Sequence, residues 1–361
     1  MRTDAQLAES VDRFYHSFWQ RRSGQRPPVA VVHEGIFSPI RYLRCAFTAP
    51  RVQPHDVTRD RLLDDYEFDA ATRRVFCDDW IPFSAAWRGI PWLEAWCGCP
   101  VRYSSGSLAP EHVAETVEQL AAGPLPACPE WFELLRRETE RMTATMPADC
   151  WVSPSILRGA SDVLGALRGL TDFYLDLYDA PATVAQVAER INQLLIQALD
   201  MHFAIVPPKR GGFGHIFGYW APDRTICIQE DTLGMCAPAV YRDLFWEGTA
   251  QIVRHLGGCV LFHLHSTGYQ HYREVLRVQG IAGLQMVIEA NGPPLRQLVP
   301  VFREVLERTR LMLFIDHGFE ELAESLRRLP HEGLCLLIND RYLPSERDYR
   351  AFLAANWAGD Y

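Results

Sequence analysis

Eight short apolar runs recur along the chain, each followed by a loop and then by a stretch of helical periodicity. The runs occupy residues 28–33, 75–79, 151–154, 225–231, 259–265, 283–289, 311–317 and 333–340. Between them, apolar residues at helical spacing predict helices over 179–195, 298–308 and 320–329. Strands that alternate with helices imply a mainly parallel sheet with right-handed crossovers. Eight such units predict one α/β domain over residues 1–361, a (β/α)₈ TIM barrel.

Two segments lie outside this alternation. Residues 1–26 have the pattern of an amphipathic surface helix that precedes the first strand. Residues 80–150 are rich in tryptophan and proline and are long for a strand-to-helix connection. We expect this insertion to cap the C-terminal mouth of the barrel.

Composition narrows the class of partner. A net charge of −9 without a lysine or arginine cluster argues against a nucleic-acid-binding surface. No run is as long and apolar as a membrane span, and the N-terminus lacks the apolar core of a secretion signal. Ten cysteines without a CxxC motif fit the reducing cytoplasm. We therefore expect a cytoplasmic monomer or homodimer acting on a small molecule.

The run 259–265 ends in two histidines, His263 and His265. Because strand side chains alternate between faces, both imidazoles point the same way at the strand's C-terminal end. In α/β barrels and doubly wound sheets, that end carries the active site. Two imidazoles on one face are suitable ligands for zinc or another divalent metal. The alternative is one buried histidine bonded to backbone and one histidine at the rim.

Other ionisable residues end the remaining runs, and we expect them at the same mouth. Glu289 ends the run after the two histidines and is the predicted third metal ligand. Capping of the following helix is an equally good interpretation for some of the acidic residues, Asp231 among them. Capping does not explain the histidines or Glu289. The candidates at the run ends are His33, Asp78, Asp79, Glu230, Asp231, Glu289, Asp316, His317 and Asp340.

Several segments, taken in order, resemble the uroporphyrinogen decarboxylase superfamily. They are residues 78–83, 93–102, 157–169, 175–181, 229–241, 263–268 and 283–289. The resemblance covers about residues 75–340 and lies in the order and spacing of the segments. It implies a (β/α)₈ barrel with its site at the C-terminal mouth.

One branch of this superfamily implies zinc-dependent methyl transfer between a methylcorrinoid and a thiol. That branch has an H-x-C motif after the fifth strand and a cysteine after the eighth. This chain has His263 and His265 at the first position and no cysteine at residues 338–341. A site made of two histidines and Glu289 is harder than a thiolate site and suits zinc, iron or manganese. The branch also implies a corrinoid co-substrate and a corrinoid protein as partner.

The other branch implies decarboxylation of uroporphyrinogen or a similar tetrapyrrole carboxylate without a cofactor. Asp78 or Asp79 stands where that branch has its catalytic aspartate, and repulsion within the pair would raise the pKa of Asp79. The arginine-rich motif of the branch is missing after the first strand. A third interpretation is a non-catalytic barrel that binds a corrinoid or tetrapyrrole.

The remaining candidates carry supporting roles in these interpretations. Glu230 and His317 are predicted as further catalytic groups. His33, Tyr219, Trp220 and Asp340 are predicted to bind the substrate.

Overall fold

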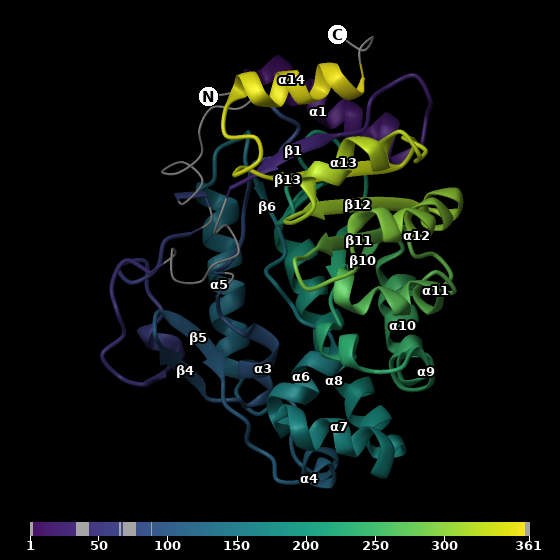
Figure 1. Cartoon of the computed structure of the whole chain (residues 1–361). Helices are drawn as coiled ribbons and strands as arrows, with labels where there is room; N and C mark the ends of the chain where they lie inside the picture. Colours follow the sequence, from purple (N-terminus) through teal and green to yellow (C-terminus); the bar gives the residue numbers. More distant parts are fainter. Residues whose placement is uncertain (1–2, 34–42, 65, 68–76, 88, 358–361) are drawn as a thin grey trace.

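A six-stranded parallel sheet forms the centre of the protein. The computed structural model describes residues 3–33, 43–64, 66–67, 77–87 and 89–357. The strands lie in the order β1 (Val29–Val32), β13 (Leu334–Asn339), β12 (Arg310–Ile315), β11 (Gly283–Ile288), β10 (Cys259–His265) and β9 (Thr225–Ile228). Figure 1 shows β1, β13, β12, β11 and β10 side by side, with helices α10 to α13 beside them. The predicted α/β fold with a parallel sheet is confirmed.

Both faces of the sheet are buried, which explains the continuous apolar runs in the sequence. On one face, Leu261, Met312 and Leu337 pack with aromatic side chains from the N-terminal segment. On the other face, Phe262, Leu284 and Leu313 pack in the larger core that includes the helices. Alternation along β10 puts His263 and His265 on the same face as Leu261.

Helices connect successive strands, as parallel pairing requires. The predicted helices correspond to α8 (Pro181–Ile205), α12 (Leu295–Arg308) and α13 (Phe319–Leu326). Further helices from residue 225 onward are α9 (Pro238–Val240), α10 (Trp246–Leu256), α11 (Tyr272–Val275) and α14 (Glu346–Asn356). No helix in the described part of the chain is long and apolar enough to cross a membrane.

A separate parallel pair, β3 (Phe83–Ser84) and β6 (Trp151–Val152), lies beyond β1 in the chain. The strand predicted at 75–79 is absent from its described part, residues 77–79, whereas 75 and 76 lie outside the described residues. Instead, Val29 N–H donates to the Asp79 carboxylate (2.9 Å) and Val31 N–H donates to the Asp78 carboxylate (2.7 Å). These carboxylates take the place of strand carbonyls beside β1. Within the described residues, the strand ladder is not continuous around a barrel.

The N-terminal segment is more buried than the expected surface helix. Helix α1 (Asp4–Arg13) continues into the π-helical turn η1 (Phe14–Trp19). Phe14, Phe18 and Trp19 are buried, and the Trp19 indole donates to the carbonyl of Trp220 (2.6 Å). The segment packs against the hairpin β7 (Phe213–His215) and β8 (Tyr219–Ala221), because its aromatic face needs an apolar partner.

The insertion forms its own small layer, seen at the lower left of Figure 1. Its strands β4 (Val101–Ser104) and β5 (Ser107–Pro110) form an antiparallel sheet with β2 (Arg51–Val52), which precedes the insertion in the chain. Helix α3 (Trp92–Cys97) packs on α5 (Pro129–Thr145) and on α6 (Ala160–Arg168). Helices α4 (Val117–Ala122) and α7 (Leu170–Asp179) also lie against α8. Coverage of the barrel mouth by this insertion stays a prediction.

Candidate metal centre

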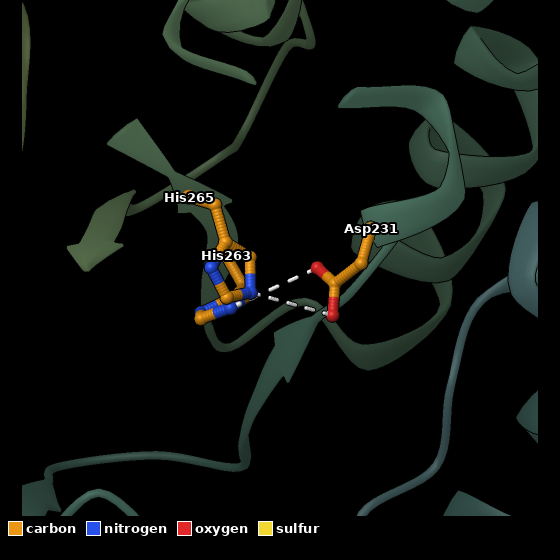
Figure 2. Close-up of side chains that lie close together, drawn as sticks. All are labelled: Asp231, His263 and His265. Carbon is orange, nitrogen blue, oxygen red and sulfur yellow. Dashed lines mark ion pairs between the residues drawn. The ribbon is translucent and has the colours of Figure 1, made fainter. Parts of the chain in front are cut away.

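The two histidines of β10 lie close to the carboxylate of Asp231, which belongs to the turn that follows the neighbouring strand β9. The ligand atoms of His263, His265 and Asp231 all lie within 4.8 Å of one another. The Nε2 atom of each histidine is 3.7 Å from an Asp231 oxygen. Figure 2 shows both rings turned toward this carboxylate. The side chain of His263 is 5% exposed and that of Asp231 is 37% exposed, so the cluster opens at the aspartate.

Asp231 begins the 3₁₀ turn η4 (Asp231–Met235), which follows β9 after two connecting residues. Helix α6 holds this turn through two reciprocal caps. Asp162 in the first turn of α6 accepts from the backbone N–H groups of Asp231 (3.2 Å) and Thr232 (2.7 Å). Glu230 in turn accepts from the N–H groups of Ala160 (3.2 Å) and Ser161 (2.8 Å) at the start of α6. These caps fix the position of the Asp231 backbone.

Gly159 allows the start of α6 to lie close to the residues that follow β9. Its N–H donates to the Gln229 carbonyl (2.7 Å). A Cβ at this position would lie 2.2 Å from the Gln229 oxygen and 2.4 Å from the Glu230 carboxyl carbon. Glycine is therefore required here by space, because a methyl group would separate α6 from β9.

Each histidine also has an acceptor on its other ring nitrogen. The Nδ1 of His263 donates to the side-chain oxygen of Gln285, its register partner on β11. The Nδ1 of His265 contacts the Glu289 carboxylate at 2.9 Å. A proton on Nδ1 leaves the Nε2 lone pair free, and both Nε2 atoms face Asp231. Metal-ligating histidines usually have this arrangement.

The electrostatics of the cluster follow from its crowded carboxylates. Burial and the nearby Asp231 raise the pKa of Asp162 to about 6, and burial and Asp162 raise that of Glu230 to about 8. Burial alone would raise the pKa of Asp231, but His263 and His265 lower it. Burial lowers the pKa of His263, whereas the Asp231 carboxylate, 3.7 Å from Nε2, raises that of His265 to about 9. A cation between these groups would relieve the excess negative charge.

A cavity of about 70 Å³ adjoins the cluster. Its walls include all three clustered residues, together with Glu230, Thr267 and Gly268. The volume is enough for a few water molecules or one small ligand group, and both polar and apolar side chains line it. A ligand in this cavity would reach the histidines directly.

Glu289, the predicted third ligand, lies on the outer side of His265. It contacts Nδ1 rather than facing the Nε2 atoms, and its backbone N–H donates to Ser266 Oγ (3.1 Å). Asp231 faces both Nε2 atoms instead. Glu289 is therefore placed to orient His265, and Asp231 completes the three-residue cluster.

Asp79 and Asp78 lie away from the cluster and serve the fold. Asp79 is buried and forms ion pairs with Arg13 (2.5 Å) and Arg26 (2.6 Å). Burial would raise the pKa of Asp79, but these two arginines outweigh it and hold the pKa at about 2. The expected raised pKa is therefore wrong, because the sequence did not reveal that two arginines face this carboxylate.

Tyr219 and Trp220 lie in the aromatic core near the beginning of β9, at the end of the sheet opposite to the cluster. The Tyr219 hydroxyl pairs with Thr225 Oγ1 (2.8 Å), and Thr225 is the first residue of β9. Trp220 is 3% exposed and touches Gly212 in the hairpin. Both residues pack in the core, and their positions give no support to substrate binding.

The other candidates lie at the C-terminal ends of β1, β12 and β13. His33 Nδ1 pairs with the Asp340 carboxylate (2.8 Å), and both side chains are partly buried. His317 is exposed beyond the end of β12. Asp316 accepts from the Asn339 amide (2.9 Å). These residues are at the predicted end of the sheet, but none belongs to the three-residue cluster.

Comparisons with known proteins support the fold. No family model matches the chain, and no curated protein sequence matches it. Among solved structures, the chain is similar to a methyltransferase from Methanosarcina mazei, with a TM-score of 0.63 and 10% identity. The alignment covers 96% of this chain and 98% of the methyltransferase. The two chains therefore share an architecture over nearly their whole length.

Proposed function

We propose that this protein is a metal-dependent methyltransferase, with a divalent metal held by His263, His265 and Asp231. The observation that carries the proposal is the pair of Nε2 atoms facing one carboxylate, each histidine being fixed through Nδ1. Two imidazoles and a carboxylate suit zinc and leave one position for a ligand, as catalytic zinc sites do. The likeness to a solved methyltransferase makes methyl transfer the first reaction to test.

We also propose that the eight parallel segments close as a (β/α)₈ barrel. Three backbone contacts outside the six-stranded sheet support closure. Asp79 N–H donates to Val29 O, Ser153 N–H to Ser84 O and Gly159 N–H to Gln229 O, at distances of 3.0, 2.8 and 2.7 Å respectively. Under this arrangement the cluster lies at the C-terminal mouth.

The residues of the chain would act as follows. His263 and His265 would hold the metal through Nε2, while Gln285 and Glu289 keep the rings in the correct tautomer. The metal, when bound, supplies Lewis acidity that stabilises the thiolate form of a thiol substrate. Thr267 and Gly268 line the cavity in which such a thiol would lie. A methylcorrinoid, free or on a carrier protein, is the methyl donor that we propose.

The decarboxylase alternative has less support. It needs an acid of raised pKa near the substrate, and Asp79 instead has a pKa of about 2 in a buried pair with two arginines. A non-catalytic tetrapyrrole-binding barrel would need no cluster of metal-ligating side chains. The three-residue cluster therefore favours the metal-dependent enzyme.

Metal analysis of protein purified without a His tag tests the proposal. We expect about one equivalent of zinc, iron or manganese, and we expect His263→Ala, His265→Ala and Asp231→Ala each to lose it. The matched control is His255→Ala, which removes a surface histidine paired with Asp200. Methyl transfer from methylcobalamin to a small thiol should depend on the metal and stop with a chelator. Wild-type protein that binds no divalent metal would contradict the proposal.

A further inference from the structure

We propose that two copies of this chain associate through an exposed apolar surface centred on α7, forming a homodimer. The inference does not depend on the metal centre, because it rests on side chains outside the three-residue cluster. Within the part of the chain that the structure describes, six large hydrophobic residues are exposed, and five of them lie on or beside α7. These five residues are named the α7 patch: Val113, Leu170, Leu175, Tyr178 and Met235.

Helix α7 carries apolar side chains on both its inner and its outer side. Phe173 and Leu177 are buried and pack in the larger core, against α6 and α8. Leu170, Leu175 and Tyr178 lie on the outer side and are exposed. Figure 1 shows α7 at the lower end of the molecule, beside α6 and α8. A helix face that meets only water normally carries polar residues, so the outer side of α7 has the composition of a contact surface.

The turn η4 continues the patch beyond α7. A Cβ at Gly165 would meet both Leu170 Cδ2 (3.0 Å) and Thr232 Cγ2 (3.4 Å), so Leu170 lies against this turn. The Tyr174 hydroxyl, one helical turn after Leu170, donates to the carbonyl of Thr232 (2.8 Å). Met235 ends η4 and is 86% exposed. The apolar surface therefore extends from the helix to the turn.

The area of the patch fits a second copy of the chain. Val113 joins the patch just before α7, where its N–H donates to the Leu167 carbonyl (2.9 Å). The five residues of the patch have exposed fractions between 47% and 86%. With roughly 200 Å² for a fully exposed large side chain, they present about 600 Å². Two copies related by a two-fold axis would cover both patches at once and bury about 1,200 Å², the lower limit for a stable specific interface.

The charge of α7 gives this dimer a characteristic salt dependence. The helix has three aspartates and no lysine or arginine. Asp176 pairs with Arg168 (2.6 Å), whereas Asp172 and Asp179 are exposed at the edge of the patch. Association of two such surfaces brings like charges together, which opposes dimer formation at low ionic strength. Salt screens this repulsion and leaves the apolar contact, so the dimer should tighten as salt rises. A basic partner protein would show the opposite dependence.

Sedimentation equilibrium of the full chain tests the proposal, with protein up to about 200 μM. An interface of this size predicts a monomer–dimer equilibrium with a dissociation constant on the order of 10 μM at about 0.5 M NaCl. At about 0.05 M NaCl the dimer should be about 3- to 10-fold weaker.

Variants on the patch locate the contact. Tyr178→Glu and Leu175→Glu should each weaken the dimer about 30-fold or more, because each puts a charge into the apolar interface. Tyr15→Glu is the matched control, since Tyr15 is the exposed large hydrophobic residue outside the patch and the variant adds the same charge. It should leave the dimer unchanged. Asp172→Asn combined with Asp179→Asn should tighten the dimer about 3- to 10-fold at low salt, a gain that a folding defect cannot produce.

Three results would contradict the proposal. The first is wild-type protein that stays monomeric at both salt concentrations up to about 200 μM. The second is a dimer that both glutamate variants leave intact, because its contact would then lie elsewhere. The third is a dimer that weakens as salt rises, because its interface would then be ionic. None of these results bears on the proposed metal centre, which metal analysis tests separately.

Discussion

His263 and Gln285 are register partners on β10 and β11, and the histidine Nδ1 donates to the glutamine side-chain oxygen. Both side chains are buried, so the bond fixes the imidazole in a place where water does not compete. We expect Gln285→Leu to lower zinc affinity about 10- to 100-fold, since loss of such an outer partner lets the ring turn or change tautomer. Competition with a colorimetric chelator measures the affinity. Unchanged affinity would show that Gln285 has no part in positioning His263.

Glu289 and Asp231 are predicted to differ in their effects on the metal. Asp231→Ala should remove the metal, because it deletes a ligand. Glu289→Ala should keep about one equivalent but bind it about 10- to 100-fold less tightly, because it deletes only the partner of His265 Nδ1. Equilibrium dialysis with metal analysis distinguishes the two. Loss of metal in Glu289→Ala with retention in Asp231→Ala would restore Glu289 as the ligand.

Asp79 is predicted to act on stability and not on the metal. Its pKa in the folded protein, about 2, is below the ordinary 3.8, so the ionised form is favoured by folding. This contribution is fully present above pH 3.8 and is lost as pH falls through about 2; its size is about 2 kcal/mol. Urea unfolding measured between pH 7 and pH 2.5 should show this fall.

Asp79→Asn should weaken that pH dependence and lower the free energy of unfolding at pH 7 by about 3 kcal/mol, because the buried Arg26 loses its ion pair with the Asp79 carboxylate. Asp243→Asn, which alters an exposed pair with Arg242, is the control and should change it by less than about 0.5 kcal/mol. Bound metal should stay at one equivalent in both variants. Full stability of Asp79→Asn would refute this structural role.

Gly159→Ala is predicted to disturb the metal centre from a distance. The added Cβ would collide with the Gln229 carbonyl and the Glu230 carboxyl group, with a cost of about 1–3 kcal/mol. Displacement of the turn that carries Asp231 should also weaken metal binding. Gly234→Ala is a nearby control, since its Cβ would meet nothing closer than 3.9 Å. Equal behaviour of the two variants in thermal unfolding and metal binding would contradict this explanation.

The sequence predicted the strands of the sheet well, because both of their faces are buried and their apolar runs are continuous. The runs at 259–265 and 283–289 became β10 and β11 with nearly the same bounds. The run at 75–79 was harder to interpret, because its acidic residues accept hydrogen bonds from β1 in place of strand carbonyls. Local sequence pattern carries no sign of this substitution.

The candidate site was predicted in part for a similar reason. Strand alternation is enough to put His263 and His265 on one face. The choice between Asp231 and Glu289 depends on which ring nitrogen each carboxylate meets, and that depends on the register of β9, β10 and β11.

The reciprocal caps between α6 and the turn after β9 have a thermodynamic consequence. His263 and His265 belong to strand β10, whereas Asp231 belongs to the turn after β9. Hydrogen bonds made by the Asp162 and Glu230 carboxylates connect that turn to α6. A metal ion bound to all three would cross-link that turn to the sheet, so opening of the turn and release of the ion would be one equilibrium. By mass action, free zinc at 100 times its dissociation constant would add about 2.7 kcal/mol to the stability of the folded state. The melting temperature of this protein would then report the zinc concentration around it.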